Sequence, residues 1–199
     1  MRVGIIDSGC ANVASVAFAV QRAGGDPFSS ADPARIEEAD RVILPGVGTA
    51  RAAMERLRQT GLDKLIPRLE QPVLGICLGM QILHEASEED HIRCLGILPG
   101  RLKAIPPGKT ARVPHMGWNQ LVMTRSDDPL VAGIDDGDYG YFVHSYYLAP
   151  GAATIAESNH GLPLAAIVRQ DNFWGCQFHP ERSATLGARI LKNFMELPC

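Results

Sequence analysis

The sequence lacks the features that mark membrane, secreted and nucleic-acid-binding proteins. No apolar run approaches the roughly 20 residues of a membrane-spanning helix, and residues 1–7 lead into a strand pattern without the apolar stretch of a signal peptide. The formal net charge is -3, with acidic and basic residues interspersed, so no basic stripe is available to a nucleic acid. We therefore expect a cytoplasmic protein that binds neither membranes nor nucleic acids.

Cysteine pairs with metal-binding or redox spacing are also missing. The cysteines number five and include no CxxC motif, which argues against a zinc site or a redox pair. Reduced thiols are expected at Cys10, Cys77, Cys94, Cys176 and Cys199. With 199 residues, 46% of them hydrophobic, the chain can bury roughly two-thirds to three-quarters of its unfolded surface without a structural metal. We expect a single domain over residues 1–199, with no metal and no cofactor.

The first half of the chain repeats a strand, turn and helix pattern. Apolar runs at 3–7, 41–45 and 72–76 each lead into a turn, after which apolar residues recur at helical spacing. Strands that are so uniformly apolar, separated by helices, indicate a parallel sheet covered on both faces. The sequence therefore predicts an α/β fold.

The second half has shorter apolar runs, with proline and glycine between them. We interpret them as antiparallel additions, at 112–114, 141–143, 154–156, 165–168 and 173–178. A final helix is predicted over about 183–196. Its residues Leu186, Ile190 and Phe194 are four residues apart, so that one apolar face would pack on the sheet.

A cysteine lies in the turn between the third strand and its helix. The segment Gly75-Ile76-Cys77-Leu78-Gly79 has the spacing of the G-x-S-x-G elbow, in which glycines relieve crowding around a nucleophile held in a strained conformation. The first turn of a helix also favours the thiolate, which is the reactive form. Taken alone, the segment is equally consistent with a catalytic cysteine and with a small buried hydrophobic residue.

Two further segments could complete a catalytic site. Gln177-Phe178-His179-Pro180-Glu181 supplies a base and a carboxylate that could orient it, although each could instead be an ordinary structural or surface residue. Leu44-Pro45-Gly46-Val47-Gly48 ends a strand with glycines that could turn backbone N–H groups toward an oxyanion. A glycine-rich turn after a strand is usually only a turn.

Together, GICLGMQ at 75–81, FHPE at 178–181 and PGVG at 45–48 resemble the class I glutamine amidotransferases. The resemblance implies an open, largely parallel sheet flanked by helices, and hydrolysis of the glutamine side-chain amide through a γ-glutamyl thioester. It implies a catalytic triad of Cys77, His179 and Glu181. The glutamine-binding residues that it implies are Gly46, Gly48, Leu78, Gly79, Gln81, His144, Ser145 and Tyr146, with Gly46 to Gly48 forming the oxyanion strand.

Segments 7–12, 114–119, 141–146 and 179–183 extend the resemblance over the full length. They are similar to one branch of the class, in which the ammonia passes to a cyclase subunit with a (β/α)₈ barrel. Many members of this branch have tyrosine where this chain has Ser8 and glycine where it has Ala11. The partner-contacting residues implied are Asn12, His115, Met116, Trp118, Asn119 and Arg182. Met116 and Trp118 could also be core residues at alternate positions of a strand.

Three alternative interpretations differ from this one in the motifs they require. Another glutaminase of the same class, such as that of anthranilate or pyridoxal phosphate synthesis, would share the triad and differ at 114–119 and 141–146. A cysteine hydrolase or protease would share the elbow, but it would have no reason to contain FHPE and PGVG. A non-catalytic binding module would be expected to have lost a triad residue, and none is substituted.

Overall fold

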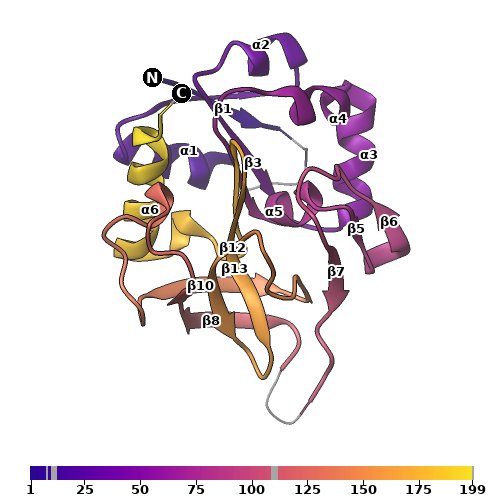
Figure 1. Ribbon diagram of the computed structural model, residues 1–199. Coiled ribbons are helices and arrows are strands. Elements are labelled where there is room, and N and C mark those ends of the chain that lie inside the picture. Colours follow the sequence, from indigo (N-terminus) through magenta and orange to yellow (C-terminus); the bar gives the residue numbers. More distant parts are fainter. Residues whose placement is uncertain (8, 10–12, 109–111, 199) are drawn as a thin grey trace.

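The computed structural model describes residues 1–7, 9, 13–108 and 112–198. Eight strands form the main sheet (Figure 1). In spatial order they are β2 (Asp26–Ser30), β1 (Arg2–Ile6), β3 (Arg41–Gly46), β4 (Val73–Cys77), β14 (Phe173–Cys176), β13 (Pro163–Gln170), β12 (Thr154–Asn159) and β9 (Val122–Met123). The first five strands pair in parallel, and the last three join antiparallel. This arrangement confirms the predicted α/β fold with antiparallel additions.

Two smaller sheets flank the main one. One consists of β8 (His115–Gln120) paired with β10 (Tyr139–His144), and the other of β11 (Tyr146–Tyr147), β7 (Arg101–Ala104), β5 (Ala86–Ser87) and β6 (Ile92–Arg93). The helices are α1 (Val13–Arg22), α2 (Pro33–Glu37), α3 (Ala50–Thr60), α4 (Leu62–Leu65), α5 (Leu78–Leu83) and α6 (Ala184–Glu196). Short 3₁₀ turns are η1 (Ile66–Arg68), η2 (Glu89–His91), η3 (Pro129–Val131) and η4 (Pro180–Arg182).

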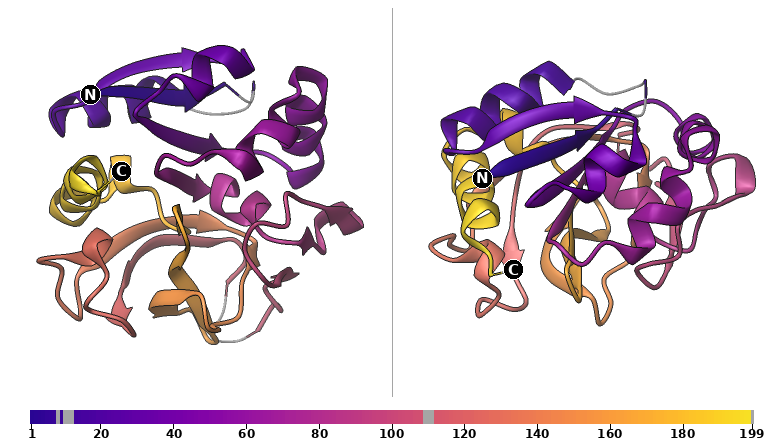
Figure 2. Two further views of the ribbon diagram at one scale, coloured as in Figure 1. Left: turned by 45° about the horizontal axis from the view of Figure 1, so that its top comes forward. Right: turned by 90° about the horizontal axis from the view of Figure 1, so that it is seen from above.

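Helices cover both faces of the main sheet, as the two views of Figure 2 show. Side chains of β3 alternate between the two faces, so Ile43 packs with α1 and α6, whereas Val42 and Leu44 pack with α2 to α5. All three of these β3 side chains are fully buried. Burial on both faces explains why the parallel strands are apolar at every position.

The helix boundaries follow local rules that the sequence displays. Asp32 caps α2 by accepting from the Ala34 N–H, and Pro33 occupies the first helical position. The last helix, α6, begins at Ala184, close to its predicted start, and its Phe194 is fully buried. Within the described residues, no helix is long and apolar enough to cross a membrane.

Two predicted segments differ from the structure. Segment 173–178 was expected to be an antiparallel addition, but β14 runs parallel to β4 on one side and antiparallel to β13 on the other. An apolar strand has the same sequence pattern in either direction, so the pattern could not decide between them. Residues 112–114 are not a strand; the strand begins at His115.

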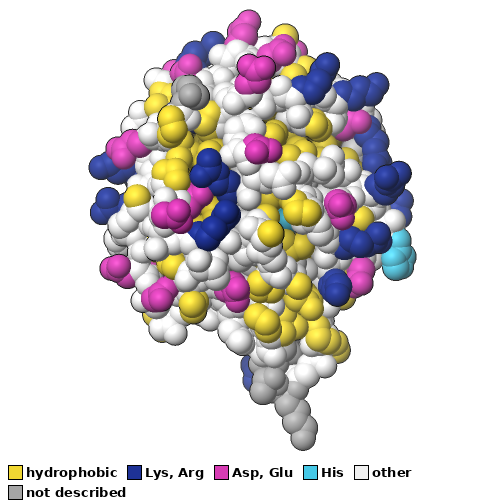
Figure 3. Space-filling model, in the orientation of Figure 1, with side chains coloured by type: hydrophobic (Ala, Val, Ile, Leu, Met, Phe, Trp, Pro, Cys, Tyr) yellow, Lys and Arg dark blue, Asp and Glu magenta, His cyan; other side chains and the backbone are white. Residues whose placement is uncertain are grey.

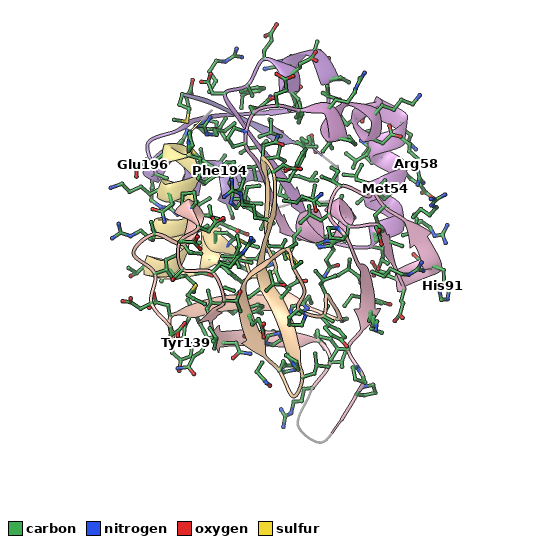
Figure 4. All side chains as sticks on the ribbon, viewed as in Figure 1. Met54, Arg58, His91, Tyr139, Phe194 and Glu196 are labelled. Atoms are coloured by element: carbon green, nitrogen blue, oxygen red, sulfur yellow. The ribbon has the colours of Figure 1, made fainter. Side chains whose placement is uncertain are left out.

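Charges of both signs are interspersed over the face shown in Figure 3. On that face, hydrophobic side chains gather near β7 and β13. In Figure 4, Tyr139 of β10 and His91 of η2 project from opposite sides of the molecule. Tyr139 is 51% exposed.

Candidate active site

Cys77 lies at the junction of β4 and α5, in a strained turn. Its φ of 53° and ψ of −110° are rare for a residue with a side chain, and such a conformation costs roughly 1–3 kcal/mol. The glycines on either side permit close contact between β3, β4 and α5. A Cβ atom on Gly79 would lie 1.7 Å from the carbonyl oxygen of Leu44, and one on Gly75 would lie 2.7 Å from the backbone nitrogen of Met80. The strand, turn and helix can therefore pack in this way only with glycine at both positions.

His179 and Glu181 follow β14, the neighbour of β4 in the sheet. Nδ1 of His179 lies 2.9 Å from Oε1 of Glu181, and both side chains are largely buried. The backbone of His179 is fixed on both sides: its N–H donates to the Tyr141 carbonyl over 2.9 Å, and its carbonyl accepts from the Ser183 hydroxyl over 2.7 Å. The imidazole thus has one rigid orientation, with Nε2 left for another partner.

That partner is the Cys77 sulfur. Burial alone would disfavour the charged imidazolium, but hydrogen bonds to Cys77 and Glu181, together with the charges of both, raise the pKa of His179 to about 10. The Cys77 thiol also lies 3.6 Å from the Val143 carbonyl oxygen. A positively charged His179 therefore lies beside the Cys77 sulfur.

A pocket of about 330 Å³ opens over Cys77. This volume is at the lower end of the range for small-molecule sites, roughly 300–1,000 Å³. The residues expected for catalysis and glutamine binding that line the pocket are Gly48, Cys77, Leu78, Gln81, His144, Ser145, Tyr146 and His179. Gly46 and Gly79 are not part of this wall. Both glycines pack behind Cys77, and Gly46 lies opposite Cys77 where β3 pairs with β4.

The end of β3 brings the predicted oxyanion strand to the pocket. Val47 and Gly48 line the pocket next to Cys77, and Val47 is 43% exposed. Gly48 has a φ of 90°, and an added Cβ there would meet no atom within 4 Å, so backbone conformation and not crowding favours glycine. The backbone of this segment therefore borders the same pocket as the Cys77 sulfur.

Two pocket-side residues were not identified from the sequence. Glu89, in η2, lines the pocket and accepts from the Ala50 N–H over 2.6 Å, and burial raises its pKa. It is one acid within an ordinary acidic stretch, so nothing local marks it. Gln177 is fully buried and its Nε2 lies 3.8 Å from the Cys77 sulfur. Its only signal is its place two residues before His179.

Strand β8 has an exposed face and an inward face. Met116 is 63% exposed and Trp118 52%, so two of the predicted partner-contact residues face outward. His115 is only 3% exposed, with its ring against His144, and this corrects its expected place on the exposed surface. Successive residues of a strand point to opposite faces, so His115 and Met116 cannot share one. Asn119 lies on the inward side and contacts His115.

The remaining predicted contacts lie beside this strand or outside the described residues. Arg182 is exposed, and its guanidinium lies 5.7 Å from the ring centroid of Tyr141, which also packs edge-on against Trp118. Asn12 falls outside the residues that the structure describes. Over the described part of the chain, no three histidine, cysteine or acidic side chains are placed to hold a metal ion.

Comparison with known proteins places this geometry in a family. Residues 12–197 match the family model described as glutamine amidotransferase class-I. The chain is 51% identical over 195 residues to the imidazole glycerol phosphate synthase subunit HisH of Xylella fastidiosa strain Temecula1, covering 98% of this chain and 97% of that protein. It is 50% identical over 198 residues to the protein of the same name from Yersinia pestis, covering 99% and 100%.

Solved structures share the fold at much lower identity. A crystal structure of a glutamine amidotransferase superposes with a TM-score of 0.76 at 19% identity, covering 98% of this chain and 97% of that one. The structure of PurLQS from Thermotoga maritima gives a TM-score of 0.74 at 18% identity, covering 98% and 97%.

Proposed function

The chain belongs to the class I glutamine amidotransferases, and from this membership we propose that it is the glutaminase subunit of an imidazole glycerol phosphate synthase. In this role it hydrolyses glutamine to glutamate and ammonia and passes the ammonia to a cyclase subunit with a (β/α)₈ barrel, in histidine biosynthesis. The observation that carries the proposal is the turn at Cys77, which opens on the same pocket as His179, while Glu181 holds the other side of the His179 ring. The chemistry needs a reduced thiol, which suits a cytoplasmic location. We propose one amidotransferase domain over residues 1–199.

In the proposed reaction, the Cys77 thiolate attacks the side-chain carbonyl carbon of glutamine. A sulfur–carbon bond forms, and the negative charge moves to the oxygen, which accepts a hydrogen bond from the backbone of the Gly46-Val47-Gly48 strand. As the carbon–nitrogen bond breaks, the leaving nitrogen takes the proton held by His179 and departs as ammonia. A γ-glutamyl thioester on Cys77 remains.

His179 then changes from acid to base. Acylation removes the charge on the sulfur. Because the Cys77 sulfur is one cause of the raised His179 pKa, that pKa falls when the charge is lost. The imidazole, neutral after giving its proton to ammonia, can take a proton from water as the water attacks the thioester. The sulfur–carbon bond breaks, glutamate leaves and the thiolate is restored. Glu181 accepts a hydrogen bond from Nδ1–H, so that Nε2 faces the reaction.

The pocket offers complementary groups for the α-ammonium and α-carboxylate of glutamine. Glu89 provides a negative charge to the ammonium group. Nε2 of Gln81 is bonded to the Tyr146 carbonyl at 3.0 Å, which leaves Oε1 as the acceptor for the substrate. Backbone groups of residues 144–146 line the same wall and supply contacts to the carboxylate.

The exposed face of β8 is the surface that we propose for the cyclase subunit. Met116 and Trp118 project from it, and Arg182 adds a charge close by. Large exposed apolar side chains of this kind often become buried anchors in an interface. Asn12 stays a predicted contact. The inward-facing His115 and Asn119 would act behind this surface and not on it.

Trapping the thioester tests the proposal. The chain, mixed with glutamine and its cyclase subunit and quenched in acid, should yield a γ-glutamyl adduct on the peptide that contains Cys77, detected by mass spectrometry. His179→Ala should form little adduct, and an assay of free ammonia should show the same loss. Ammonia release without any adduct at Cys77, or an adduct on another residue, would refute the proposed nucleophile.

A further inference from the structure

The buried amide of Gln177 contacts the proposed nucleophile but has no role in the triad described above. Its Nε2 donates to the Cys77 sulfur over 3.8 Å, and its Oε1 accepts from Nε2 of Gln81 over 2.9 Å. Gln177 is fully buried, directly after β14. Buried polar groups need partners, so these two contacts determine how the amide is held.

A backbone carbonyl fixes the direction of this amide. The Tyr146 oxygen accepts from Nε2 of Gln81 over 3.0 Å and from Nδ1 of His144 over 2.7 Å. Because a carbonyl can only accept, Gln81 must direct its NH₂ group toward it. The second N–H of that group reaches Oε1 of Gln177. The NH₂ group of Gln177 therefore faces the sulfur as a donor.

The same chain of hydrogen bonds continues from His144 to strand β8. Nε2 of His144 lies 2.9 Å from Nδ1 of His115, and Nε2 of His115 lies 3.2 Å from Nδ2 of Asn119. Since His144 donates from Nδ1, its Nε2 must accept from His115. His115 in turn accepts at Nε2 from Asn119. Every hydrogen bond in the chain from Asn119 through His115 and His144 to the Tyr146 carbonyl therefore donates in the same direction.

Burial keeps the two rings in this arrangement. It lowers the pKa of His144 to about 4, despite the bond to Tyr146, and that of His115 to about 3, with the neighbouring His144 and His160 adding to the effect. The His115 ring is also stacked between Phe142 and His160, with centroids 4.7 and 4.0 Å away. Neutral rings retain one donor and one acceptor each, as the chain requires.

We propose that Gln177 is a further catalytic residue, which donates an N–H to the Cys77 thiolate. Behind it, His144 and His115 are positioning residues that act through the Tyr146 carbonyl, which accepts from both His144 and Gln81, and they connect the donor to strand β8. This inference rests on the proposed role of Cys77 as nucleophile.

The donor acts when the sulfur carries charge. During acylation the sulfur–carbon bond forms and the sulfur loses its charge. During deacylation that bond breaks and the electron pair returns to the sulfur. The N–H of Gln177 therefore stabilises the thiolate before attack and again as the leaving group when glutamate departs. Hydrogen bonds to charged groups typically stabilise enough to change a rate roughly ten- to a hundredfold.

Gln177→Glu removes the donor when the carboxylate is ionised. The variant keeps the shape and the acceptor for Gln81, but it places a charged oxygen against the sulfur where the N–H was, so its charge adds to the loss of the donor. In the complex with the cyclase subunit, we expect kcat for glutamine hydrolysis to fall at least about tenfold, with KM changed less than about threefold. Alkylation of Cys77 by iodoacetamide should slow in parallel.

Gln71→Glu is the matched control, because it makes the same chemical change where the amide donates to the carbonyl oxygens of Ile36 and Glu37, far from Cys77 in the fold. Gln71→Glu should leave kcat for glutamine hydrolysis and the rate of Cys77 alkylation unchanged. Ammonium-dependent synthesis by the complex of each variant should match that of wild type. Wild-type kcat and wild-type alkylation in Gln177→Glu would overturn the inference. A wild-type complex that forms no thioester at Cys77 would instead refute the proposed function.

A pair of substitutions at His115 tests the chain without altering Gln177. His115→Leu removes the donor to His144, whereas His115→Asn keeps an N–H close to the position of Nδ1. We expect the leucine variant to lose roughly two- to tenfold in kcat with a smaller change in KM, and the asparagine variant to recover part of the loss. Equal kcat in the two variants, or a loss confined to KM, would overturn the positioning role.

Discussion

Replacing Gly79 by alanine should displace the elements that hold Cys77. A Cβ atom at position 79 would lie 1.7 Å from the carbonyl oxygen of Leu44 in β3. The shortest ordinary carbon–oxygen contacts are about 3.3 Å, so α5 and β3 must separate by about 1.5 Å. Since α5 begins directly after Cys77, the displacement reaches the sulfur and changes its distance from His179.

The expected effects on stability and on rate are both large. Overpacking of this kind typically destabilises by about 1–3 kcal/mol, and a misplacement of about 1 Å can lower a rate by roughly a hundredfold. Urea unfolding measures the loss of stability, and the rate of glutamine hydrolysis in the complex measures the loss of activity. Gly151→Ala is the control, because its added Cβ would meet no atom within 4 Å. A folded Gly79→Ala protein with wild-type kcat would refute the packing argument.

The remaining predictions concern the triad, the oxyanion strand and a buried histidine. His179→Ala should nearly abolish glutamine hydrolysis and Glu181→Gln should retain more, because the carboxylate only orients and stabilises the imidazolium; the reverse order in steady-state rates would contradict these roles. We expect the backbone N–H of Val47 to turn toward the oxyanion only when the liganded cyclase subunit is bound, and this turn would act as a switch. Val47→Pro removes that N–H, so stimulation by the liganded cyclase subunit, roughly a hundred- to a thousandfold in wild type, should be lost; full stimulation would exclude this switch. Burial lowers the pKa of the fully buried His84 from 6.5 to about 4, so the folded protein binds fewer protons than the unfolded chain. The free energy of unfolding should be intact above pH 6.5 and fall by about 3 kcal/mol toward pH 4. In urea titrations over that range, His84→Leu should lose less of its free energy of unfolding than wild type. Equal losses of stability in acid by wild type and His84→Leu would contradict this role of His84.

The sequence predicted the elements that position the site because their signals are local. Uniformly apolar strands and the glycines beside Cys77 are visible in the sequence, and the structure has β3, β4 and α5 where these patterns place them. Strand β2 gave no comparable signal, because an edge strand is paired on one side only and its residues Asp26–Ser30 are mostly not buried. The parallel direction of β14 also depends on which neighbour the chain reaches, and no local pattern encodes that.

The parts of the site that the sequence did not reveal depend on contacts between distant segments. Glu89 reaches the pocket through η2, and Gln177 is held by Gln81, which is 96 residues away. The inward position of His115 depends on which face of β8 turns toward the core, and the residue types at 114–119 do not decide it.

The most direct test of the account compares two ammonia sources for one Cys77→Ala complex. The variant complex with its cyclase subunit is supplied with glutamine in one assay and with ammonium salt in the other, and synthesis of imidazole glycerol phosphate is followed in both. Glutamine-dependent synthesis should be abolished, while ammonium-dependent synthesis should equal that of the wild-type complex, since the nucleophile serves only to release ammonia. Glutamine-dependent synthesis by Cys77→Ala at a rate comparable to wild type would show that Cys77 is not the nucleophile.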